Sequence, residues 1–318
     1  MTILRLQSAH VKFVQYVIEF ELQYETITAI RMPMTEMRRF RPFASFLSAM
    51  IPLAIVAQAA PLVPVAQIKA LEISECSGIA KSRQFDDLYW THNDSGGSAA
   101  IYAITAKGNL VASIDTRLPN IDWEDIATDN RGNLYLADTG NFDNTRRDLV
   151  IHKIIEPSPS SNNRQLSAES FYFVYPEQSA FPPAKRLYDC EALFWANDTL
   201  FLLTKSLGDT ATSLYRFDTL EADAVNRPFL LDAFDIGPRV TAADASPDGS
   251  QLAILTTRSV WVFQKPNDSG RYFDGHARVR TIQAGQCEAI CWQDDNTLLI
   301  ANEARQLFQV PLSTLVEY

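Results

Sequence analysis

The sequence predicts an all-β fold, a β-propeller with five four-stranded blades. Three observations lead to this prediction. A unit of short apolar runs and polar turns recurs five times in phase, each unit spans about 50 residues, and a spare apolar run precedes the first unit. Hydrophobic residues make up 47% of the 318 positions and charged residues 21%, which is the balance of a globular protein with a core. A degenerate sixth blade, hidden in the longer step between the second and third units, is the alternative.

The N-terminal region is predicted to be a targeting segment and not part of the fold. Residues 37–59 begin with three arginines among their first five positions, continue as an apolar stretch at 43–56 and end in Ala57-Gln58-Ala59, the order of parts in a secretory signal peptide. The apolar stretch is shorter than the ~20 residues of a membrane span, and an uncleaved anchor is the alternative. Residues 1–36 are interpreted as an over-extended N-terminus. We therefore expect an exported protein, periplasmic or extracellular, whose residues 60–318 form one propeller domain with no membrane span after cleavage.

Each unit opens with two apolar runs joined by a turn rich in Asp, Asn or Gly, which is a hairpin signal. The first runs, expected to line the central channel, are residues 76–80, 123–127, 190–194, 241–245 and 287–291. The second runs are residues 88–90, 134–136, 200–202, 252–254 and 298–300.

A third and a fourth apolar run complete most units. The third runs are residues 101–104, 149–152, 214–217, 260–263 and 307–310. The fourth runs are residues 110–114, 171–174, 229–231 and 279–282, and the last unit has no clear fourth run. The spare run at 65–70 is expected to take that place and close the ring. The polar stretch 156–164 is interpreted as a loop that lengthens the second unit.

One mouth of the channel is expected to gather carboxylates, because the first strands begin there and the second strands end there. The residues at the start of the first strands are Ser77, Glu124, Glu191, Ala242 and Glu288, with Asp244 on the same side of its strand but deeper. The loops just before two of these strands contribute Asp122 and Asp189. The ends of the second strands contribute Asn93, Asp94, Asp138, Asn141, Lys205 and Glu303.

Several carboxylates in a narrow channel repel one another and need a cation, a proton or a basic partner. Oxygen ligands favour Ca²⁺ or Mg²⁺, and the sequence has no His/Cys cluster at zinc spacing. The candidate metal ligands are Glu124, Glu191, Asp244 and Glu288. The candidate contacts for a small polar ligand are Asn93, Asp94, Asp138, Asn141, Lys205 and Glu303.

Two functional interpretations follow from this mouth. In the first, a cation held by Glu124, Glu191 and Glu288 binds a ligand or activates water for ester hydrolysis, while Lys205 stabilises negative charge. In the second, the glutamates form a structural acidic column that hydrogen-bonds neighbouring blades, and the propeller is a non-enzymatic interaction platform.

The charge balance and the missing motifs exclude several functions. The chain has 28 basic and 38 acidic side chains, and its net charge of −10 argues against a nucleic-acid partner. The sequence has no nucleotide-binding glycine pattern and no Gly-x-Ser-x-Gly elbow, so we expect neither a nucleotide cofactor nor a serine hydrolase. A monomer is expected.

Three cysteines, Cys76, Cys190 and Cys287, occupy equivalent positions one residue before the carboxylate column. We expect buried free thiols, with a disulfide between Cys76 and Cys287 across the ring closure as the alternative.

The repeated motifs resemble a group of secreted bacterial propellers that is loosely related to the phytase-esterase-like and SdiA-regulated propeller families. The motifs are Ser77-Gly78-Ile79, Asn93-Asp94-Ser95-Gly96, Asp122-Trp123-Glu124-Asp125-Ile126, Asp138-Thr139-Gly140-Asn141, Asp189-Cys190-Glu191-Ala192, Thr204-Lys205, Thr241-Ala242-Ala243-Asp244, Pro247-Asp248-Gly249 and Glu288-Ala289-Ile290. The resemblance covers roughly residues 70–305 and implies a propeller fold and export. Phytase-like relatives use Ca²⁺ and act on phosphate esters. This chain departs from them because it has no obvious Lys/Arg cluster for several phosphates.

The signal-peptide interpretation predicts cleavage after Ala59, because the small-residue motif follows the apolar stretch directly. N-terminal sequencing of protein recovered from the exported fraction is expected to begin at Ala60. A mature protein that still carries Met37 contradicts the prediction.

Overall fold

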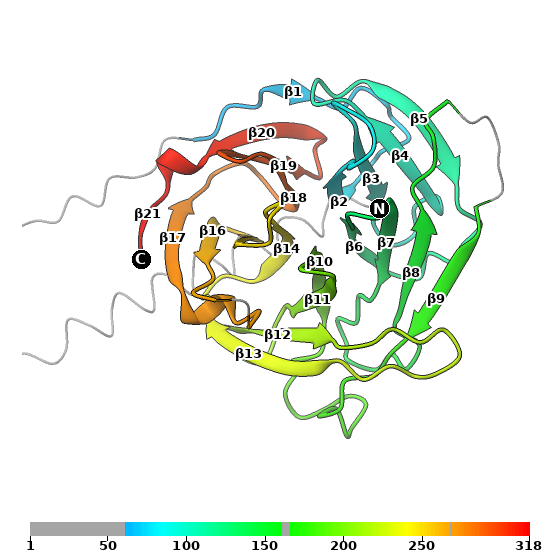
Figure 1. Ribbon diagram of the computed structural model, residues 1–318, viewed down its shortest axis with the longest axis vertical. Coiled ribbons are helices and arrows are strands. Elements are labelled where there is room, and N and C mark those ends of the chain that lie inside the picture. Colours follow the sequence, from blue (N-terminus) through cyan, green and yellow to red (C-terminus); the bar gives the residue numbers. More distant parts are fainter. Residues whose placement is uncertain (1–60, 161–165, 268) are drawn as a thin grey trace, which may run out of the picture. The chain divides into compact units, whose positions relative to one another are not determined.

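The computed structural model describes residues 61–160, 166–267 and 269–318, which form a ring of five antiparallel sheets around a common centre (Figure 1). Each sheet is one blade of a propeller, so the predicted fold class is confirmed. The predicted signal peptide at 37–59 and the segment 1–36 lie outside the described residues. Within the described ranges, no helix has both the length and the apolar character needed to cross a bilayer.

The first three blades follow the chain in order, from the innermost strand outward. Blade one consists of β2 (Cys76–Lys81), β3 (Tyr89–Asn93), β4 (Ala100–Ile104) and β5 (Leu110–Asp115). Blade two consists of β6 (Trp123–Thr128), β7 (Asn133–Asp138), β8 (Val150–Ile155) and β9 (Ala168–Tyr172). Blade three consists of β10 (Cys190–Ala196), β11 (Thr199–Thr204), β12 (Ala211–Phe217) and β13 (Phe229–Asp235).

The last two blades use both ends of the described chain. Blade four consists of β14 (Val240–Ala245), β15 (Gln251–Thr256), β16 (Ser259–Gln264), β17 (His276–Thr281) and β21 (Val316–Glu317). Blade five consists of β18 (Cys287–Asp294), β19 (Thr297–Asn302), β20 (Gln306–Pro311) and β1 (Ala66–Gln67). Two short 3₁₀ helices, η1 (Tyr272–Asp274) and η2 (Leu312–Thr314), lie in connections. The described residues between β9 and β10 form no further sheet, so the sixth-blade alternative is wrong.

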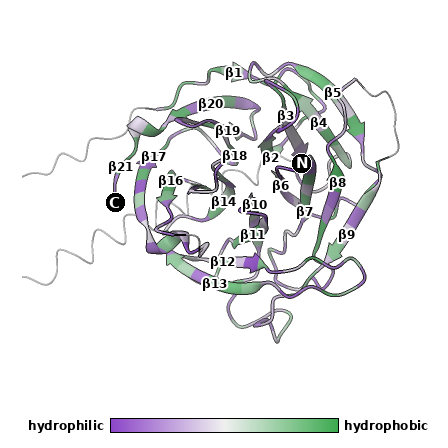
Figure 2. Cartoon of the chain, viewed as in Figure 1, coloured by the Kyte–Doolittle hydropathy of each residue, from purple (hydrophilic) through white to green (hydrophobic). Residues whose placement is uncertain are grey.

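The place of a strand in its blade decides its hydropathy pattern. The inner strand β10 is buried at nearly every position, whereas the outer strand β5 alternates between half-buried and exposed residues. A strand covered on both faces reads as a continuous apolar run, and a half-covered strand alternates. Figure 2 shows hydrophilic and hydrophobic residues alternating along the outer strand β17.

The hydrophobic clusters lie between neighbouring blades. One cluster joins Phe194 of blade three to Trp261 of blade four, and another joins Tyr135 of blade two to Leu202 of blade three. The other three clusters join the remaining pairs of neighbours. Each blade therefore buries its faces only against the next blade, and the core is complete only when the ring is closed.

The predicted hairpin turns are confirmed by their backbone conformation. Asn197 and Asp198 have φ values of 50° and 60°, and Gly132 has a φ of 80°. Two consecutive residues with positive φ are typical of the tight turn whose twist matches that of the flanking strands. These residues join the first and second strands of blades two and three.

The predicted ring closure is also confirmed. The spare N-terminal strand β1 pairs antiparallel with β20, with Ala66 opposite Leu307 and Gln67 opposite Gln306. Ile68, which directly follows β1, is 1% exposed and belongs to the cluster between blades five and one. The C-terminal strand β21 was not expected. It pairs with the outer edge of β17 and makes blade four five-stranded.

We expect Ile68→Ala to lower the free energy of unfolding by about 2–5 kcal/mol, because the side chain is removed from a closed core. Urea unfolding of the purified protein measures the change. Val65→Ala is the matched control, because Val65 is 53% exposed and its hydrogen bond to Leu307 uses the backbone.

Deletion of residues 60–72 is expected to abolish cooperative unfolding, because it removes the strand that closes the ring. If the deletion variant melts like the parent, β1 does not close the ring.

Candidate functional site

Each inner strand carries a β-bulge close to the residue where the strand begins. The unpaired residues of these bulges are Ser77, Glu124, Glu191, Thr241 and Glu288. A bulge residue lies outside the hydrogen-bonded ladder, and its side chain is re-aimed. The predicted column is therefore confirmed except in blade four, where Thr241 and not Ala242 holds the equivalent place. The small side chains around Ala242 gave no apolar pattern from which the register could be read.

Two bulge glutamates meet aspartates from neighbouring loops. Carboxylate oxygens of Glu124, Asp189 and Glu191 lie within 4.8 Å of one another, and those of Asp94, Asp122 and Glu124 form a second such group. Glu124 belongs to both groups. We call these five residues the acidic mouth. They come from blades one, two and three.

Asp122 and Asp189 were not assigned as metal ligands from the sequence, although a signal for them exists. Asp122 stands two residues before Glu124, and Asp189 stands two residues before Glu191. The bulge turns both members of each Asp-x-Glu pair toward the same mouth. The repeat of this Asp-x-Glu spacing in consecutive blades is the sequence signal that places both aspartates at the mouth.

Burial and mutual repulsion raise the pKa values of the mouth carboxyls. Burial is the main cause for Glu124 and Glu191, whose pKa values lie well above the ordinary value, and the nearby charge of Glu191 adds to the effect on Glu124. Burial also raises the pKa of Asp122 to about 6 and that of Glu288 to about 7. These raised pKa values favour the protonated form of the mouth carboxyls at a higher pH than is usual for Asp and Glu.

One oxygen of Asp189 is left without a partner. Asp189 is 1% exposed, and its Oδ1 accepts a hydrogen bond of 2.6 Å from the backbone N–H of Asn141. Its Oδ2 is buried and accepts no hydrogen bond from a nitrogen or hydroxyl donor of the described residues, while the neighbouring Glu191 carboxyl, when protonated, can donate to Asp189. A buried acceptor without a donor costs about 1–3 kcal/mol, and more when the group is charged. A cation in contact with Oδ2 removes that cost.

The carboxylate of Glu124, like Oδ2 of Asp189, lacks a hydrogen-bond donor. Within the described ranges, no hydrogen-bond donor contacts its side chain, whereas its backbone carbonyl accepts the Ser77 hydroxyl at 3.2 Å. Gly140 lies directly against this carboxylate, and a Cβ at that position would overlap Glu124 Oε1 and Asp122 Oδ2. Only glycine leaves these two oxygens room to converge.

Two basic side chains partly balance the mouth. Lys205 Nζ lies 2.8 Å from Glu191 Oε2, and the two side chains are 19% and 5% exposed. Arg146 is held by Asp138 at 2.9 Å and donates to the carbonyl of Gly140 at 2.9 Å. Lys205 therefore contacts a glutamate of the column directly, whereas Arg146 is bound to Asp138 and to the Gly140 carbonyl.

The other residues predicted to contact a ligand differ in whether their polar atoms are already used in hydrogen bonds within the protein. Asn93 binds the backbone of residues 72 and 75, and Asn141 binds Tyr188 and the backbone N–H of Arg146. Asp138 accepts the backbone N–H groups of residues 121 and 122. These three side chains hold loops in place. Glu303 accepts a hydrogen bond of 2.6 Å from Gln286, and Asp94 is half-buried at the mouth.

Asp244 lies elsewhere. It is placed near the end of β14, lines a cavity at the opposite end of the ring, and accepts the backbone N–H of Trp292 in blade five at 2.9 Å. Asp125 makes the corresponding contact from blade two to blade three, where its Oδ2 accepts the backbone N–H of Leu193 at 2.9 Å. The blade-to-blade hydrogen bonding considered for the glutamates is thus made by these two aspartates. This role of Asp125 was not predicted from the sequence.

The four cysteines agree with the sequence interpretation, and one histidine is packed in the core. All four cysteines are free and buried, and burial raises the pKa of the Cys76 thiol to about 11. His92 is fully buried, with its ring edge-on to Trp123 at 5.7 Å between centroids. Neither the thiols nor this imidazole is accessible for chemistry at the mouth.

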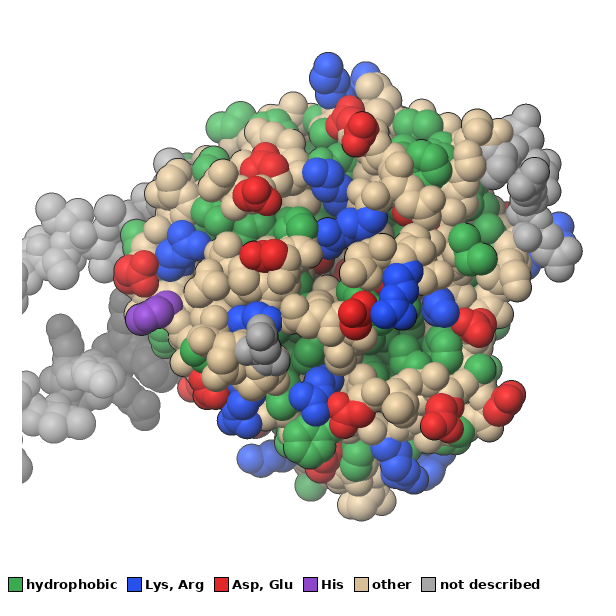
Figure 3. All heavy atoms as spheres, in the orientation of Figure 1, with side chains coloured by type: hydrophobic (Ala, Val, Ile, Leu, Met, Phe, Trp, Pro, Cys, Tyr) green, Lys and Arg blue, Asp and Glu red, His purple; other side chains and the backbone are tan. Residues whose placement is uncertain are grey.

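The charges on the visible face of the ring are mixed. Figure 3 shows acidic, basic and hydrophobic side chains interspersed over that face. The net negative charge of the chain therefore does not form a continuous acidic surface on this face.

Comparisons with known proteins recover the architecture only. No family model matches the chain, and no curated protein matches it. Among solved structures, the β-propeller domain of Myceliophteria thermophila Cps50 (Swd1) is similar, with 9% identity, a TM-score of 0.43, and coverage of 78% of this chain and 99% of that chain. U3-55K is similar with 10% identity, a TM-score of 0.39, and coverage of 74% of this chain and 68% of that chain. Neither likeness carries an argument about function.

The raised pKa values predict that the protein without added cation is more stable in mild acid than in mild base. In the folded state the pKa values of Asp122 and Glu288 rise from 3.8 and 4.5 to about 6 and about 7, so the folded state binds more protons than the unfolded state. Stability is then lost as the pH rises from about 4 to 7. Thermal melts in chelator between pH 5 and 8 measure the trend. We expect Glu288→Gln to flatten it, and a parent melting temperature that increases with pH over this range contradicts the prediction.

Proposed function

We propose that this protein is an exported β-propeller whose acidic mouth binds a divalent cation, Ca²⁺ or Mg²⁺, and through it a small polar ligand. The observation that carries the proposal is the buried Oδ2 of Asp189, which has no hydrogen-bond donor and lies among the carboxylates of Glu124 and Glu191. All candidate ligand atoms of the acidic mouth are carboxylate oxygens, which hard divalent cations prefer.

Glu124, Asp189 and Glu191 are the proposed inner ligands. Their oxygens are close enough to contact one ion, and Asp189 and Glu191 are buried. Asp94 and Asp122 lie on the more accessible side and share Glu124 with the inner group. Glu288 completes the predicted column in blade five, and its charge acts on Glu191. A ligand arriving from solvent would meet the outer carboxylates and the cation together.

Ester hydrolysis is the second candidate, and Lys205 is the observation that favours it. Its ammonium group contacts Glu191 and is close enough to act on the charges of Glu124 and Glu288. A bound divalent cation lowers the pKa of a coordinated water and polarises an ester oxygen. Glu124 and Glu191 would hold the cation together with Asp189, because Glu288, the third predicted ligand, belongs to neither carboxylate group, and the Lys205 ammonium would stabilise the negative charge that develops on the substrate.

The cation proposal predicts opposite effects of one substitution in two conditions. Glu124→Gln removes a negative charge from both carboxylate groups while keeping the shape of the side chain. We expect it to raise the melting temperature in EDTA, because repulsion is relieved, and to abolish most of the stabilisation by Ca²⁺. In the parent, Ca²⁺ at 100 times its dissociation constant stabilises the fold by about 2.7 kcal/mol. Differential scanning calorimetry in EDTA and in millimolar Ca²⁺ or Mg²⁺ measures both effects.

Glu169→Gln is the control, because Glu169 is an exposed carboxylate that pairs with Lys153 on blade two. It should respond to Ca²⁺ like the parent. If the parent melts identically in EDTA and in millimolar Ca²⁺ and Mg²⁺, and Glu124→Gln only destabilises, the acidic column is structural. The interaction-platform interpretation then stands.

A further inference from the structure

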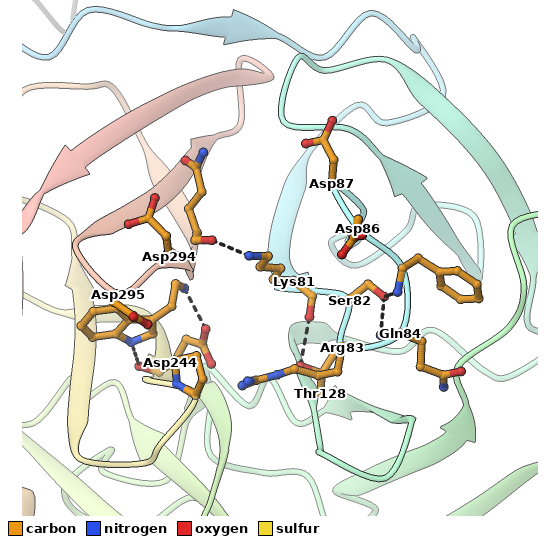
Figure 4. Close-up of a pocket in the computed structure, with 14 residues that line it drawn as sticks. Lys81, Ser82, Arg83, Gln84, Asp86, Asp87, Thr128, Asp244, Asp294 and Asp295 are labelled. Atoms are coloured by element: carbon orange, nitrogen blue, oxygen red, sulfur yellow. Dashed lines mark hydrogen bonds between the residues drawn. The ribbon is translucent and has the colours of Figure 1, made fainter.

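A second polar cavity lies at the end of the ring where the inner strands finish, opposite the acidic mouth. Its volume is about 440 Å³, and its walls come from the end of β2 and the following turn, from β6, from β14 and from the end of β18 (Figure 4). Sites for small molecules have volumes of about 300–1,000 Å³. The cavity is therefore large enough for a small organic ligand.

The cavity has an acidic lining that is interrupted by two basic side chains. The turn at residues 86–87 contributes two aspartates from blade one, Asp294 and Asp295 face them from blade five, and Asp244 comes from β14 of blade four. Lys81 and Arg83 also line it. The lining thus carries five carboxyls and two cations, and it favours a ligand with net positive charge.

Lys81 crosses the cavity wall and is held by a backbone carbonyl. Its Nζ donates a hydrogen bond of 2.5 Å to the backbone carbonyl of Gln293 in blade five. The lysine spans the gap between the first and last blades, and its ammonium lies among the carboxylates (Figure 4).

Arg83 and Asp244 point toward one another across the cavity (Figure 4). Arg83 is exposed, and its charge lowers the pKa of Asp244 against the effect of burial. Among the ion pairs of the described residues there is none between these two side chains. A guanidinium and a carboxyl that face each other without contact leave room for a group carrying both charges.

An inorganic ion does not suit this cavity. Among the described residues, the carboxyl groups close enough to share an ion are those of the acidic mouth, and none of the cavity aspartates belongs to them. Carboxylates that are too far apart to share one ion are better matched by a molecule that carries two separate positive charges.

We propose that this cavity binds a basic amino acid, a small molecule with one carboxylate and two ammonium groups. The carboxylate pairs with the planar guanidinium of Arg83, which suits two parallel hydrogen bonds. The α-ammonium group pairs with Asp244, and the side-chain ammonium reaches Asp294 and Asp295. The net charge of such a ligand, +1, complements the acidic lining.

Isothermal titration calorimetry of the full chain tests the proposal with three probes. L-lysine has all three charged groups, cadaverine lacks the carboxylate, and L-norleucine lacks the side-chain ammonium. We expect saturable binding of L-lysine, and binding of the other two that is weaker by at least about tenfold, because each loses one charge pair. Arg83→Gln should weaken L-lysine about tenfold and should not weaken cadaverine, which has no carboxylate to lose a partner and meets one repelling charge fewer.

Two further variants keep the test specific. Arg131→Gln removes an exposed arginine that pairs with Asp198 outside the cavity, and it should bind L-lysine like the parent. Glu124→Gln should also leave L-lysine binding unchanged, which separates this cavity from the cation site. The proposal is wrong if L-lysine gives no saturable heat, if cadaverine binds as tightly as L-lysine, or if Arg83→Gln does not change L-lysine binding.

Discussion

Each inner strand of the ring has one more residue at its beginning than its partner strand opposes, and that bulge residue cannot join the ladder. In blades two and three the bulge residue is a glutamate, Glu124 or Glu191, so the same backbone device delivers two carboxylates to one place. Loop aspartates two residues earlier add to them. The bulge therefore forces like charges into proximity, and the chemistry of the mouth follows from the way in which that repulsion is relieved.

The ring uses buried carboxylates in two different ways. Asp125 and Asp244 accept backbone N–H groups from the next blade, so their burial is compensated and they hold adjacent inner strands together. Glu124 and the Oδ2 of Asp189 lack such donors in the described part of the chain. The burial of a carboxylate with amide partners is compensated, whereas the buried Oδ2 of Asp189 has no such compensation and the half-buried Glu124 carboxylate is only partly open to water. This difference separates structural acids from candidate ligands.

The blades could be predicted from the sequence because apolar runs and polar turns recur five times in phase, and because the missing strand of blade five matched the spare run before blade one. The register in blade four could not, since Thr241 and its small neighbours carry no pattern that marks a bulge. The strand β21 pairs over two residues only, too few for a periodicity. The unpartnered oxygen of Asp189 depends on the position of the Asn141 loop, which no local sequence signal specifies.

Closure through β1 has a consequence for how the chain folds. Ala66 pairs with Leu307, so the contact that completes blade five joins segments separated by nearly the whole propeller. Contacts of such long range slow folding, because the entropy of closing a large loop is lost before any contact repays it. A nascent chain can form its hairpins early, yet the outer edge of blade five stays unpaired until the first strand returns to it. That open edge is a template for pairing with another molecule, so the interval before closure is when this protein is most exposed to aggregation.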